Sequence, residues 1–189
     1  MVAVSTPRFT EREYLALEGV AEVRHEFVQG DIVAMSGAEP EHNQIAQNVR
    51  FELESQVRAR GCRVAGSDQR VVAEAVGEYF YPDVVMTCSE PRYVEPSPRS
   101  LANPELIVEV LSPSTEARDR GAKWLAYQTI TSLQDYLLIS TKRRQIEHYS
   151  RVEEGWLLRK VEEGVVRLRE GLELAVDDVY RLVELVPFP

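Results

Sequence analysis

The sequence predicts an α/β protein of the α+β kind, in which a mixed β-sheet is flanked by helices. Three patterns lead to this fold class. An apolar, largely β-branched run at 105–111 is followed by a helical segment and by a second apolar run, "DYLLIS", which predicts a strand–helix–strand unit with a parallel strand pair. Residues 22–37 alternate apolar and polar side chains, which is typical of a β-hairpin. From 41 to 60, apolar residues recur at every fourth position, as in an amphipathic helix.

The N-terminal part is expected to hold a short helix, a hairpin and a longer helix. Thr10 and Glu13 fit a capping box and Gly19 fits a helix end, so the first helix is predicted at 11–18. The hairpin is expected to turn at Gly30, although Gln-Gly is a weaker turn signal than Asn-Gly. The longer helix would pack one stripe on a sheet, and this stripe consists of Ile45, Val49, Leu53 and Val57.

The middle of the chain alternates strands and loops. "CRVAG", "QRVVAEA" and "EYFYPDVVMT" are three strand candidates. Segment 88–104 contains four prolines and is expected to be a surface loop. A buried strand follows at 105–111, before Pro113, and a helix is predicted over 114–130 with Ser114 or Thr115 as its cap.

The C-terminal part is expected to be mostly β-structure. "DYLLIS" is a buried strand and "RQIEHYSR" a partly exposed one. "GWLLRKV" and "GVVRLRE" are expected to form a further hairpin, and "VDDVYRLVEL" a closing helix. The sequence contains no internal repeat or low-complexity tract, so we expect a single domain over 1–189 with additional hairpins near both ends.

Composition limits the class of protein. The 189 residues are 44% hydrophobic and 28% charged, which indicates one soluble globular domain, and no apolar stretch approaches the roughly 20 residues of a membrane helix. No secretion signal is apparent, and Cys62 and Cys88 are interpreted as reduced thiols of a cytoplasmic protein. The net charge of −9 argues against a protein that coats nucleic acid, but not against an enzyme that acts on it through a divalent cation.

Two carboxylates occupy strand positions where a carboxylate is not expected. Glu109 lies in the middle of the buried run 105–111, and Asp83 directly precedes the apolar run 84–86. Burial of a charged carboxylate is costly unless it is paired or coordinates a metal. The two acids lie 26 residues apart (109 − 83), which suits neighbouring strands joined by the proline-rich segment. Paired strands would bring both acids to one sheet edge, where their oxygens suit Mg²⁺, with Mn²⁺ as a substitute.

A cation is also expected near this pair, because metal-assisted hydrolysis of a phosphodiester benefits from one beside the scissile phosphate. Lys123 is the candidate, since it lies on the helix that follows the strand of Glu109. Tyr127, one turn further on, and Arg120, three residues earlier, are expected on the same helix face and are possible substrate-binding residues.

The motifs together resemble one protein family. "YPDVV", "PELIVEVLSPST", "DRGAKWLAY" and "LQDYLLIS" occur in this order, and "HEFVQGDIVAMSGAEPEHNQI" precedes them. This series resembles the Uma-type family of putative restriction endonucleases, a branch of the PD-(D/E)xK nuclease superfamily, from about residue 9 to the C-terminus. The resemblance implies a restriction-endonuclease-like core and an endonuclease that hydrolyses the phosphodiester bonds of DNA.

The resemblance also implies roles for individual residues. Asp83 would be the motif aspartate and Glu109 the second acid, both as metal ligands, with the carbonyl of Val110 as a third. Glu26 matches the acid of the opening hairpin and would complete the metal shell. His42 matches the histidine at the start of the second helix and is a possible substrate-binding residue.

The sequence departs from the wider superfamily at the lysine. The superfamily places a lysine two residues after the second acid, where this chain has Leu111. The Uma-type pattern has a lysine in the following helix instead, which Lys123 matches. The resemblance therefore implies a catalytic cation that reaches the site from a different backbone position, and Tyr127 matches the tyrosine of the same helix.

Each of these residues also has a purely structural interpretation. Glu109 would be neutralised by a buried arginine, Asp83 would cap a strand entry, and Lys123 would form a surface ion pair with Asp119. Glu26 would be a solvent-facing hairpin residue and His42 would bind backbone or solvent.

The remaining aromatic, histidine and basic residues suggest structural roles first. Trp124 is interpreted as a core aromatic, and His25 and His148 as surface positions. The run 142–144 is expected to cap a hairpin turn, with phosphate contact as the less favoured alternative.

Three functions compete on this basis. The leading hypothesis is a Mg²⁺-dependent endodeoxyribonuclease, and a homodimer is expected because many nucleases that cut duplexes are dimers, with the C-terminal strands as a plausible interface. The second is an inactive module of the same fold that binds nucleic acid or a protein partner. The third is a metal hydrolase of small phosphorylated molecules. A closed pocket would support this hypothesis, and a shallow, open site would count against it.

Overall fold

The strands form two six-stranded sheets and one two-stranded sheet in the computed structural model, which describes residues 8–96 and 98–185. The sheet that we call the central sheet contains, in order across it, β12 (Gly155–Val161), β11 (Ile146–Val152), β10 (Asp135–Ser140), β9 (Leu106–Leu111), β6 (Val84–Thr87) and β3 (Arg63–Gly66). It is mixed, because β9 and β10 are parallel while the other neighbouring strands are antiparallel. The mixed sheet and the parallel pair confirm the fold class predicted from the sequence.

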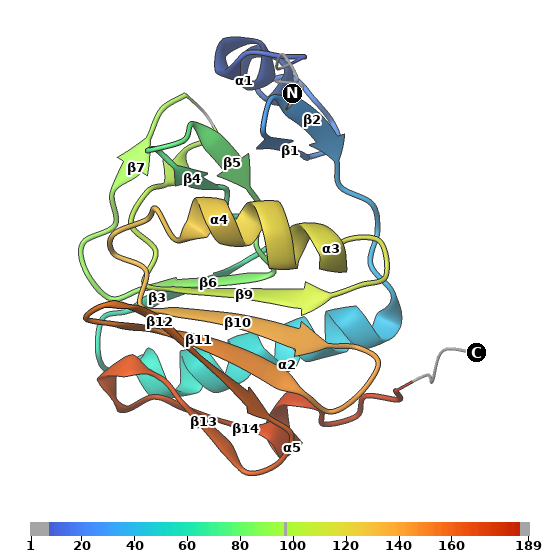
Figure 1. Cartoon of the computed structure of the whole chain (residues 1–189), viewed down its shortest axis with the longest axis vertical. Helices are drawn as coiled ribbons and strands as arrows, with labels where there is room; N and C mark the ends of the chain where they lie inside the picture. Colours follow the sequence, from blue (N-terminus) through green and yellow to red (C-terminus); the bar gives the residue numbers. More distant parts are fainter. Residues whose placement is uncertain (1–7, 97, 186–189) are drawn as a thin grey trace.

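The second sheet, which we call the N-terminal sheet, lies beyond one face of the central sheet (Figure 1). Its strands are, in order, β2 (Asp31–Ala34), β1 (His25–Val28), β5 (Glu78–Phe80), β4 (Val71–Ala73), β8 (Ser100–Leu101) and β7 (Tyr93–Val94). Helix α1 (Glu11–Glu18) covers it, and the capping box predicted for this helix is present, with the Glu13 N–H donating to Thr10 Oγ1. Gln29 and Gly30 both have positive φ angles, as the predicted hairpin turn between β1 and β2 requires.

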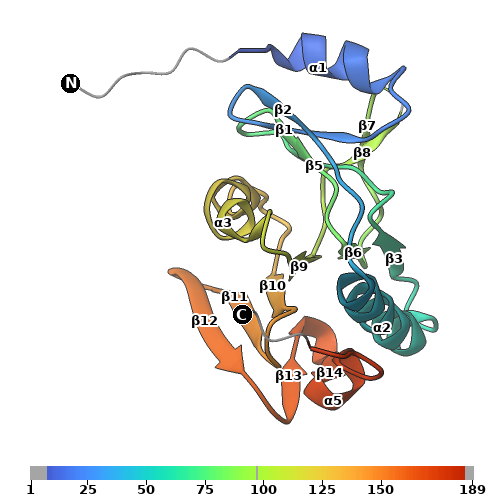
Figure 2. The same cartoon turned by 90° about the vertical axis from the view of Figure 1, so that its right-hand side faces the viewer.

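Two helical layers enclose the central sheet, as Figure 2 shows. Helix α2 (Pro40–Val57) packs on one face with the predicted apolar stripe, together with the small hairpin β13 (Val165–Arg167) and β14 (Glu173–Ala175) and helix α5 (Val176–Val179). The other face carries a helical segment made of α3 (Glu116–Arg118), a π-helical turn η1 (Asp119–Lys123) and α4 (Trp124–Tyr127). A short 3₁₀ turn η2 (Arg169–Gly171) joins β13 to β14. Strand β9 is therefore buried on both faces.

The two faces of β9 belong to different cores. Leu106, Val108 and Val110 belong to the core beneath α2, whereas Ile107 and Leu111 belong to the core beneath α4. Because side chains alternate along a strand, Glu109 points to the second face, toward the helical segment. This geometry explains why the run shows no alternation in the sequence, and it determines which elements surround Glu109.

Several sequence-based element predictions need correction. "EYFYPDVVMT" splits at Pro82 into β5 and β6, which belong to different sheets, and the proline-rich segment contains the short strands β7 and β8. The helix predicted at 114–130 ends at Tyr127. Thr115 is its N-cap residue, as predicted, but its side chain makes no cap hydrogen bond, and its N–H donates to Ser112 Oγ. The closing helix is reduced to α5.

The predicted hairpin of "GWLLRKV" with "GVVRLRE" is also wrong. Strand β12 pairs back onto β11 through a turn at Glu153 and Glu154, and β13 pairs with β14. Glu153-Glu154-Gly155 is a weaker turn signal than the segment around Gly164, which is why the sequence suggested a turn near Gly164. His148, expected at the surface, is buried, and its Nε2 is hydrogen-bonded to Asp135 Oδ1 at 2.6 Å.

The interpretation of the cysteines as reduced thiols is contradicted by a disulfide between Cys62 and Cys88. Strands β3 and β6 are antiparallel with Arg63 opposite Thr87, so the residues just outside this pair face each other. Reduced thiols were one ground for expecting a cytoplasmic location, and this ground no longer holds. Within the described residues, no helix combines the length and apolar composition needed to cross a bilayer.

Candidate functional site

Asp83 and Glu109 meet at the edge where β6 and β9 run side by side. The two strands are antiparallel, with Val84 opposite Val108. The next pair beyond this one is therefore Asp83 with Glu109. Asp83 Oδ2 accepts the backbone N–H of Val110 at 2.7 Å, which fixes the aspartate beside the residue that follows Glu109. The strand pairing predicted from the sequence therefore brings the two acids together, and the backbone of Val110 is bonded to one of them.

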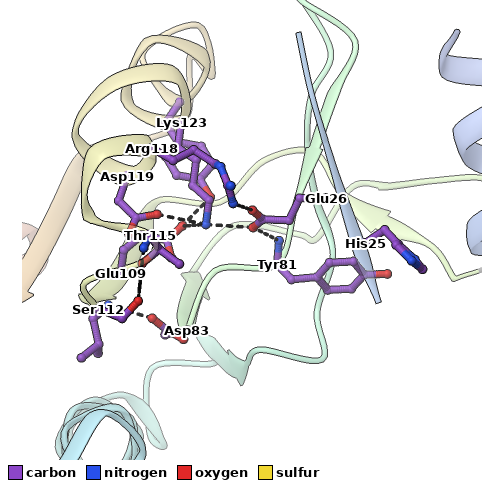
Figure 3. A network of polar contacts seen from close by, with 12 residues as sticks. His25, Glu26, Tyr81, Asp83, Glu109, Ser112, Thr115, Arg118, Asp119 and Lys123 are labelled. Carbon is purple, nitrogen blue, oxygen red and sulfur yellow. Dashed lines mark hydrogen bonds and ion pairs between the residues drawn. The ribbon is translucent and has the colours of Figure 1, made fainter. Parts of the chain in front are cut away.

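Lys123 reaches this acid pair from the π-helical turn and is almost completely buried. Its Nζ atom lies 3.1 Å from Glu109 Oε1, 2.8 Å from Glu26 Oε1 and 3.2 Å from Asp119 Oδ1 (Figure 3). Residues four apart lie on nearly the same side of a helix, which is why Asp119 and Lys123 both point inward. The structural interpretation expected a surface ion pair between Lys123 and Asp119. The pair is present, but both side chains are buried.

Three carboxylates thus share one ammonium group in the protein interior. Burial raises the pKa of Glu109 well above its ordinary value, and the charges of Asp119, Asp83 and Glu26 act in the same direction against the opposing effect of Lys123. Burial likewise raises the pKa of Asp119. Burial acts to lower the pKa of Lys123, but the three acids outweigh it and hold the pKa well above its ordinary value, so the amine stays charged. Three acids that share one amine in the interior therefore favour either a proton on Glu109 or a further cation beside it.

Glu26 holds Lys123 from the opposite side. It comes from β1 of the N-terminal sheet, is buried, and its Oε1 also accepts the backbone N–H of Tyr81 at 3.2 Å. Arg118 approaches its other oxygen at 3.8 Å. Glu26 is therefore not the solvent-facing hairpin residue of the structural interpretation, and its contacts at this site are to cations and an N–H group.

His42 lies beside Asp83 at the start of α2. Its Nε2 is 3.3 Å from Asp83 Oδ2, and its buried Nδ1 has no hydrogen-bond partner among the described residues. Burial acts to lower the pKa of His42, but the hydrogen bond and charge of Asp83 outweigh this effect and raise it. The histidine that the sequence placed here with a possible substrate-binding role is thus part of the site.

Two residues expected at the site do not reach a substrate. Tyr127 is fully buried beneath Glu109 and donates its hydroxyl to Glu109 Oε1 at 2.8 Å, so it holds the glutamate and has no access to a bound molecule. Arg120 pairs with Glu116 and with Glu147 on β11. The π-helical turn moves Arg120 off the face of Lys123, which corrects the expectation that the three residues share one side of a regular helix.

Sequence reasoning named Asp119 only as a surface partner of Lys123, because it precedes the lysine by four residues, and not as a residue of the site. It missed Arg118 altogether, because the approach of Arg118 to Glu26 depends on how the helical segment packs against the N-terminal sheet.

The site opens into a cleft of about 1200 Å³. Asp83, Glu109, Val110 and Lys123 line its floor, and the linker 35–39 between β2 and α2 lines one wall. Arg24, Arg118 and Lys142 add positive charge to the lining. The cleft is larger than the roughly 300–1,000 Å³ typical of small-molecule sites.

The donor set fits a divalent cation of the Mg²⁺ type. Mg²⁺ is usually held by one or two carboxylates with waters and substrate phosphates, rather than by a full protein cage. Asp83, Glu109 and the Val110 carbonyl supply hard oxygen atoms, and a bound cation would offset the cost of ionising Glu109 in the interior. Within the described residues no group of three acidic, histidine or cysteine side chains is placed to hold a metal by itself.

Comparisons with known proteins agree with one another. The model of the Uma2 family, described as "Putative restriction endonuclease", matches residues 12–179. Two uncharacterized proteins of Synechocystis sp., sll1609 and slr1290, are 37% and 35% identical, over 85% and 93% of this chain and 92% and 93% of their own lengths.

A solved structure has the same fold. It is described as a putative nuclease belonging to DUF820 from Anabaena variabilis, and it superposes with a TM-score of 0.73 at 18% identity, over 93% of this chain and 99% of that chain. At this level of identity the likeness concerns the fold alone.

Proposed function

Because the chain belongs to the Uma2 family of putative restriction endonucleases, we propose that it is a metal-dependent nuclease that hydrolyses phosphodiester bonds of DNA. The observation that carries the proposal is the meeting of Asp83 and Glu109 at one strand edge, with the buried Lys123 ammonium 3.1 Å from Glu109. Two acids and one amine, brought together from separate elements on the floor of a large cleft, match what phosphodiester hydrolysis requires.

In this proposal, Asp83, Glu109 and the carbonyl of Val110 hold Mg²⁺. The cation would polarise the scissile phosphate and favour attack by water when bound. Lys123 stabilises the negative charge that develops on the phosphate oxygens, and it needs no rearrangement because three carboxylates already fix its position. The sequence assigned Glu26 to the metal shell, but its contact with Lys123 supports a role in positioning this amine.

Further residues support the floor and walls of the site. Tyr127 holds one oxygen of Glu109, which leaves the rest of the carboxylate directed at the cleft. His42 is close enough to Asp83 to orient it, and it lines the cleft where a phosphate would pass. Arg118 and Lys142 line the same cleft and would contact neighbouring phosphates of the polymer.

The purified full chain with Mg²⁺ or Mn²⁺ tests this proposal. Supercoiled, linear duplex and single-stranded DNA are incubated with the wild type, with Asp83→Asn/Glu109→Gln, and with Glu105→Gln as the matched control. Glu105 is an acid next to the same strand but does not line the cleft. We expect cleavage by the wild type and the control and none by the double variant. Cleavage that survives in the double variant would rule out this mechanism.

A second candidate function is a nuclease-fold module that binds nucleic acid without cutting it. The close neutralisation of Lys123 by its own carboxylates favours this alternative, since the amine is then less available to a phosphate. Calorimetric titration with Mg²⁺ separates the two candidates. A nuclease binds the ion and loses this binding in Asp83→Asn/Glu109→Gln, whereas a module that only binds DNA gives no heat that depends on these acids.

A further inference from the structure

Strand β12 leaves one edge of the central sheet open. It is the first strand in the sheet order and pairs only with β11 within the described residues. Figure 2 shows it at the outer border of the sheet, with no further element beyond it. An open edge of this length is a template for pairing with another chain, unless it is covered or blocked.

The hydrogen bonds along β11 determine which backbone groups of β12 face outward. The N–H of Ser140 donates to the Gln145 carbonyl and the N–H of Arg151 donates to the Gln134 carbonyl, so the odd-numbered residues of β11 bond to β10. Its even-numbered residues therefore bond to β12, where Val152 lies opposite Gly155 and Ser150 opposite Leu157. The odd-numbered residues of β12 are used in this ladder, and the N–H and C=O groups of Trp156, Leu158 and Lys160 point out of the sheet.

The side chains at this edge are apolar in the middle and charged at the ends. Leu157 and Leu158 are 41% and 40% exposed, and Trp156 is half-buried beside Trp124. Glu153 and Glu154 form the turn before the strand, while Arg159 and Lys160 follow the leucines. This order, acids, then apolar residues, then bases, is complementary to itself when a second strand runs in the opposite direction.

We propose that two copies of the chain associate through β12, antiparallel and about a two-fold axis at Leu157, which joins their central sheets into one. In this register Trp156 lies opposite the partner's Leu158, and Glu154 lies opposite the partner's Lys160. Leu157 lies opposite the partner's Leu157. The outward backbone groups of Trp156 and Leu158 then form a hydrogen-bonded pair across the axis.

Neighbouring registers are less favourable. A shift that centres the axis on Leu158 places Glu154 opposite the partner's Glu162, so that like charges meet, and Trp156 opposite the partner's Lys160. A shift that centres it on Trp156 places Leu158 opposite the partner's Glu154. A shift by one residue would place the outward-pointing N–H and C=O groups of one strand opposite residues of the partner that already bond to its own β11, so no ladder would form. Lys160 already contacts Glu147, but its side chain is 53% exposed and has room for a second carboxylate.

Sedimentation equilibrium of the full chain over a range of concentrations tests the association. We expect a reversible monomer–dimer equilibrium for the wild type. Leu158→Pro should weaken the dimer by roughly tenfold or more, because proline removes an N–H that faces the partner and leaves the bonds to β11 intact. Circular dichroism and thermal unfolding verify that this variant folds. A wild type that stays monomeric, or a dimer that Leu158→Pro leaves unchanged, overturns the proposal.

Cysteine cross-linking tests the register without disturbing the strand. In the proposed dimer the two Leu157 residues form a non-hydrogen-bonded pair with Cα atoms about 4.5 Å apart, close enough for a disulfide. Leu157→Cys should therefore give a covalent dimer on mild oxidation. Leu158→Cys is the matched control, because the two residues 158 would be diagonal neighbours about 7–8 Å apart. Cross-linking through residue 158 instead of residue 157 contradicts the proposed pairing.

Discussion

Lys123 Nζ lies 2.8 Å from Glu26 Oε1, although the lysine comes from the π-helical turn above the central sheet and the glutamate from the hairpin of the N-terminal sheet. The contact joins the N-terminal sheet to the helical segment at the floor of the cleft. Because both side chains are buried, removing either one leaves the other without this ion-pair partner. The same contact therefore contributes to stability and to the geometry of the proposed catalytic amine.

Lys123→Met is expected to destabilise the protein by about 3–5 kcal/mol, because three buried carboxylates then face one another without their counter-charge. Glu26→Gln should destabilise the protein less. Its amide oxygen can still accept the N–H of Tyr81, and the substitution removes one of the three acids around Lys123. Urea unfolding of both single variants and the double variant measures the coupling. We expect the double variant to be more stable than the sum of the single effects by more than about 1 kcal/mol; strictly additive effects would contradict a direct charge interaction.

Arg118 and Arg120 provide a matched pair of substitutions two residues apart. Arg118 lines the cleft, whereas Arg120 is held by Glu116 and Glu147 outside it. If the cleft binds nucleic acid, Arg118→Ala should weaken binding to DNA of any sequence and lower the slope of log K against log salt by about 1. Arg120→Ala should leave the slope unchanged and cost up to about 1 kcal/mol of stability. Fluorescence anisotropy at several salt concentrations, with the metal omitted, measures both, and equal slopes for the two variants would place the DNA elsewhere.

Local signals in the sequence were sufficient for several elements. Thr10 and Glu13 predicted α1 because a capping box depends only on neighbouring residues. The apolar stripe predicted α2, and the unexpected carboxylate at Glu109 predicted a buried acid with a polar partner, since a buried acid needs one wherever the strand lies. These features depend on residues that are close along the chain or on the cost of burial itself.

Features that depend on tertiary packing were not visible in the same way. The segment 119–123 has the composition of a regular helix, so the π-helical turn and the displacement of Arg120 could not be predicted from periodicity. The disulfide depends on the antiparallel pairing of β3 with β6, which a spacing of 26 residues does not reveal. Glu26 reaches Lys123 only because a second sheet packs over the helical segment.

Removal of the disulfide should lower stability measurably. Cys62 and Cys88 close a loop with a sequence separation of 26 residues, and the entropy that such a cross-link removes from the unfolded chain corresponds to about 3.5 kcal/mol. Cys62→Ser/Cys88→Ser is therefore expected to unfold at lower urea concentration than the oxidised wild type. Reduction of the wild type by dithiothreitol should give the same loss and leave the double variant unchanged. An effect of dithiothreitol on the double variant would show that the reductant acts on something other than this bond.

Glu105 provides a test of pH dependence outside the candidate site. Its Oε1 accepts the backbone N–H groups of Cys88 at 3.0 Å and Ser89 at 2.7 Å. Burial acts to raise the pKa of Glu105, but these hydrogen bonds outweigh it and lower the pKa below its ordinary value. A carboxyl whose pKa is depressed in the folded state stabilises the fold above the pKa of the unfolded chain, about 4.3, and this contribution is lost as the pH falls through the lower folded value.

The stabilising effect of Glu105 should therefore be present at neutral pH and diminish in acid. Glu105→Gln keeps an oxygen acceptor but cannot be charged, so it should be less stable than the wild type at about pH 7, with a difference that narrows below about pH 4. Urea unfolding of both proteins at several pH values measures this difference directly, and the acid sensitivity common to both proteins cancels in the comparison. A difference that stays constant down to the lowest pH at which both proteins fold would mean that the charge of Glu105 contributes nothing, and that the loss comes from the altered hydrogen bonds to Cys88 and Ser89 alone.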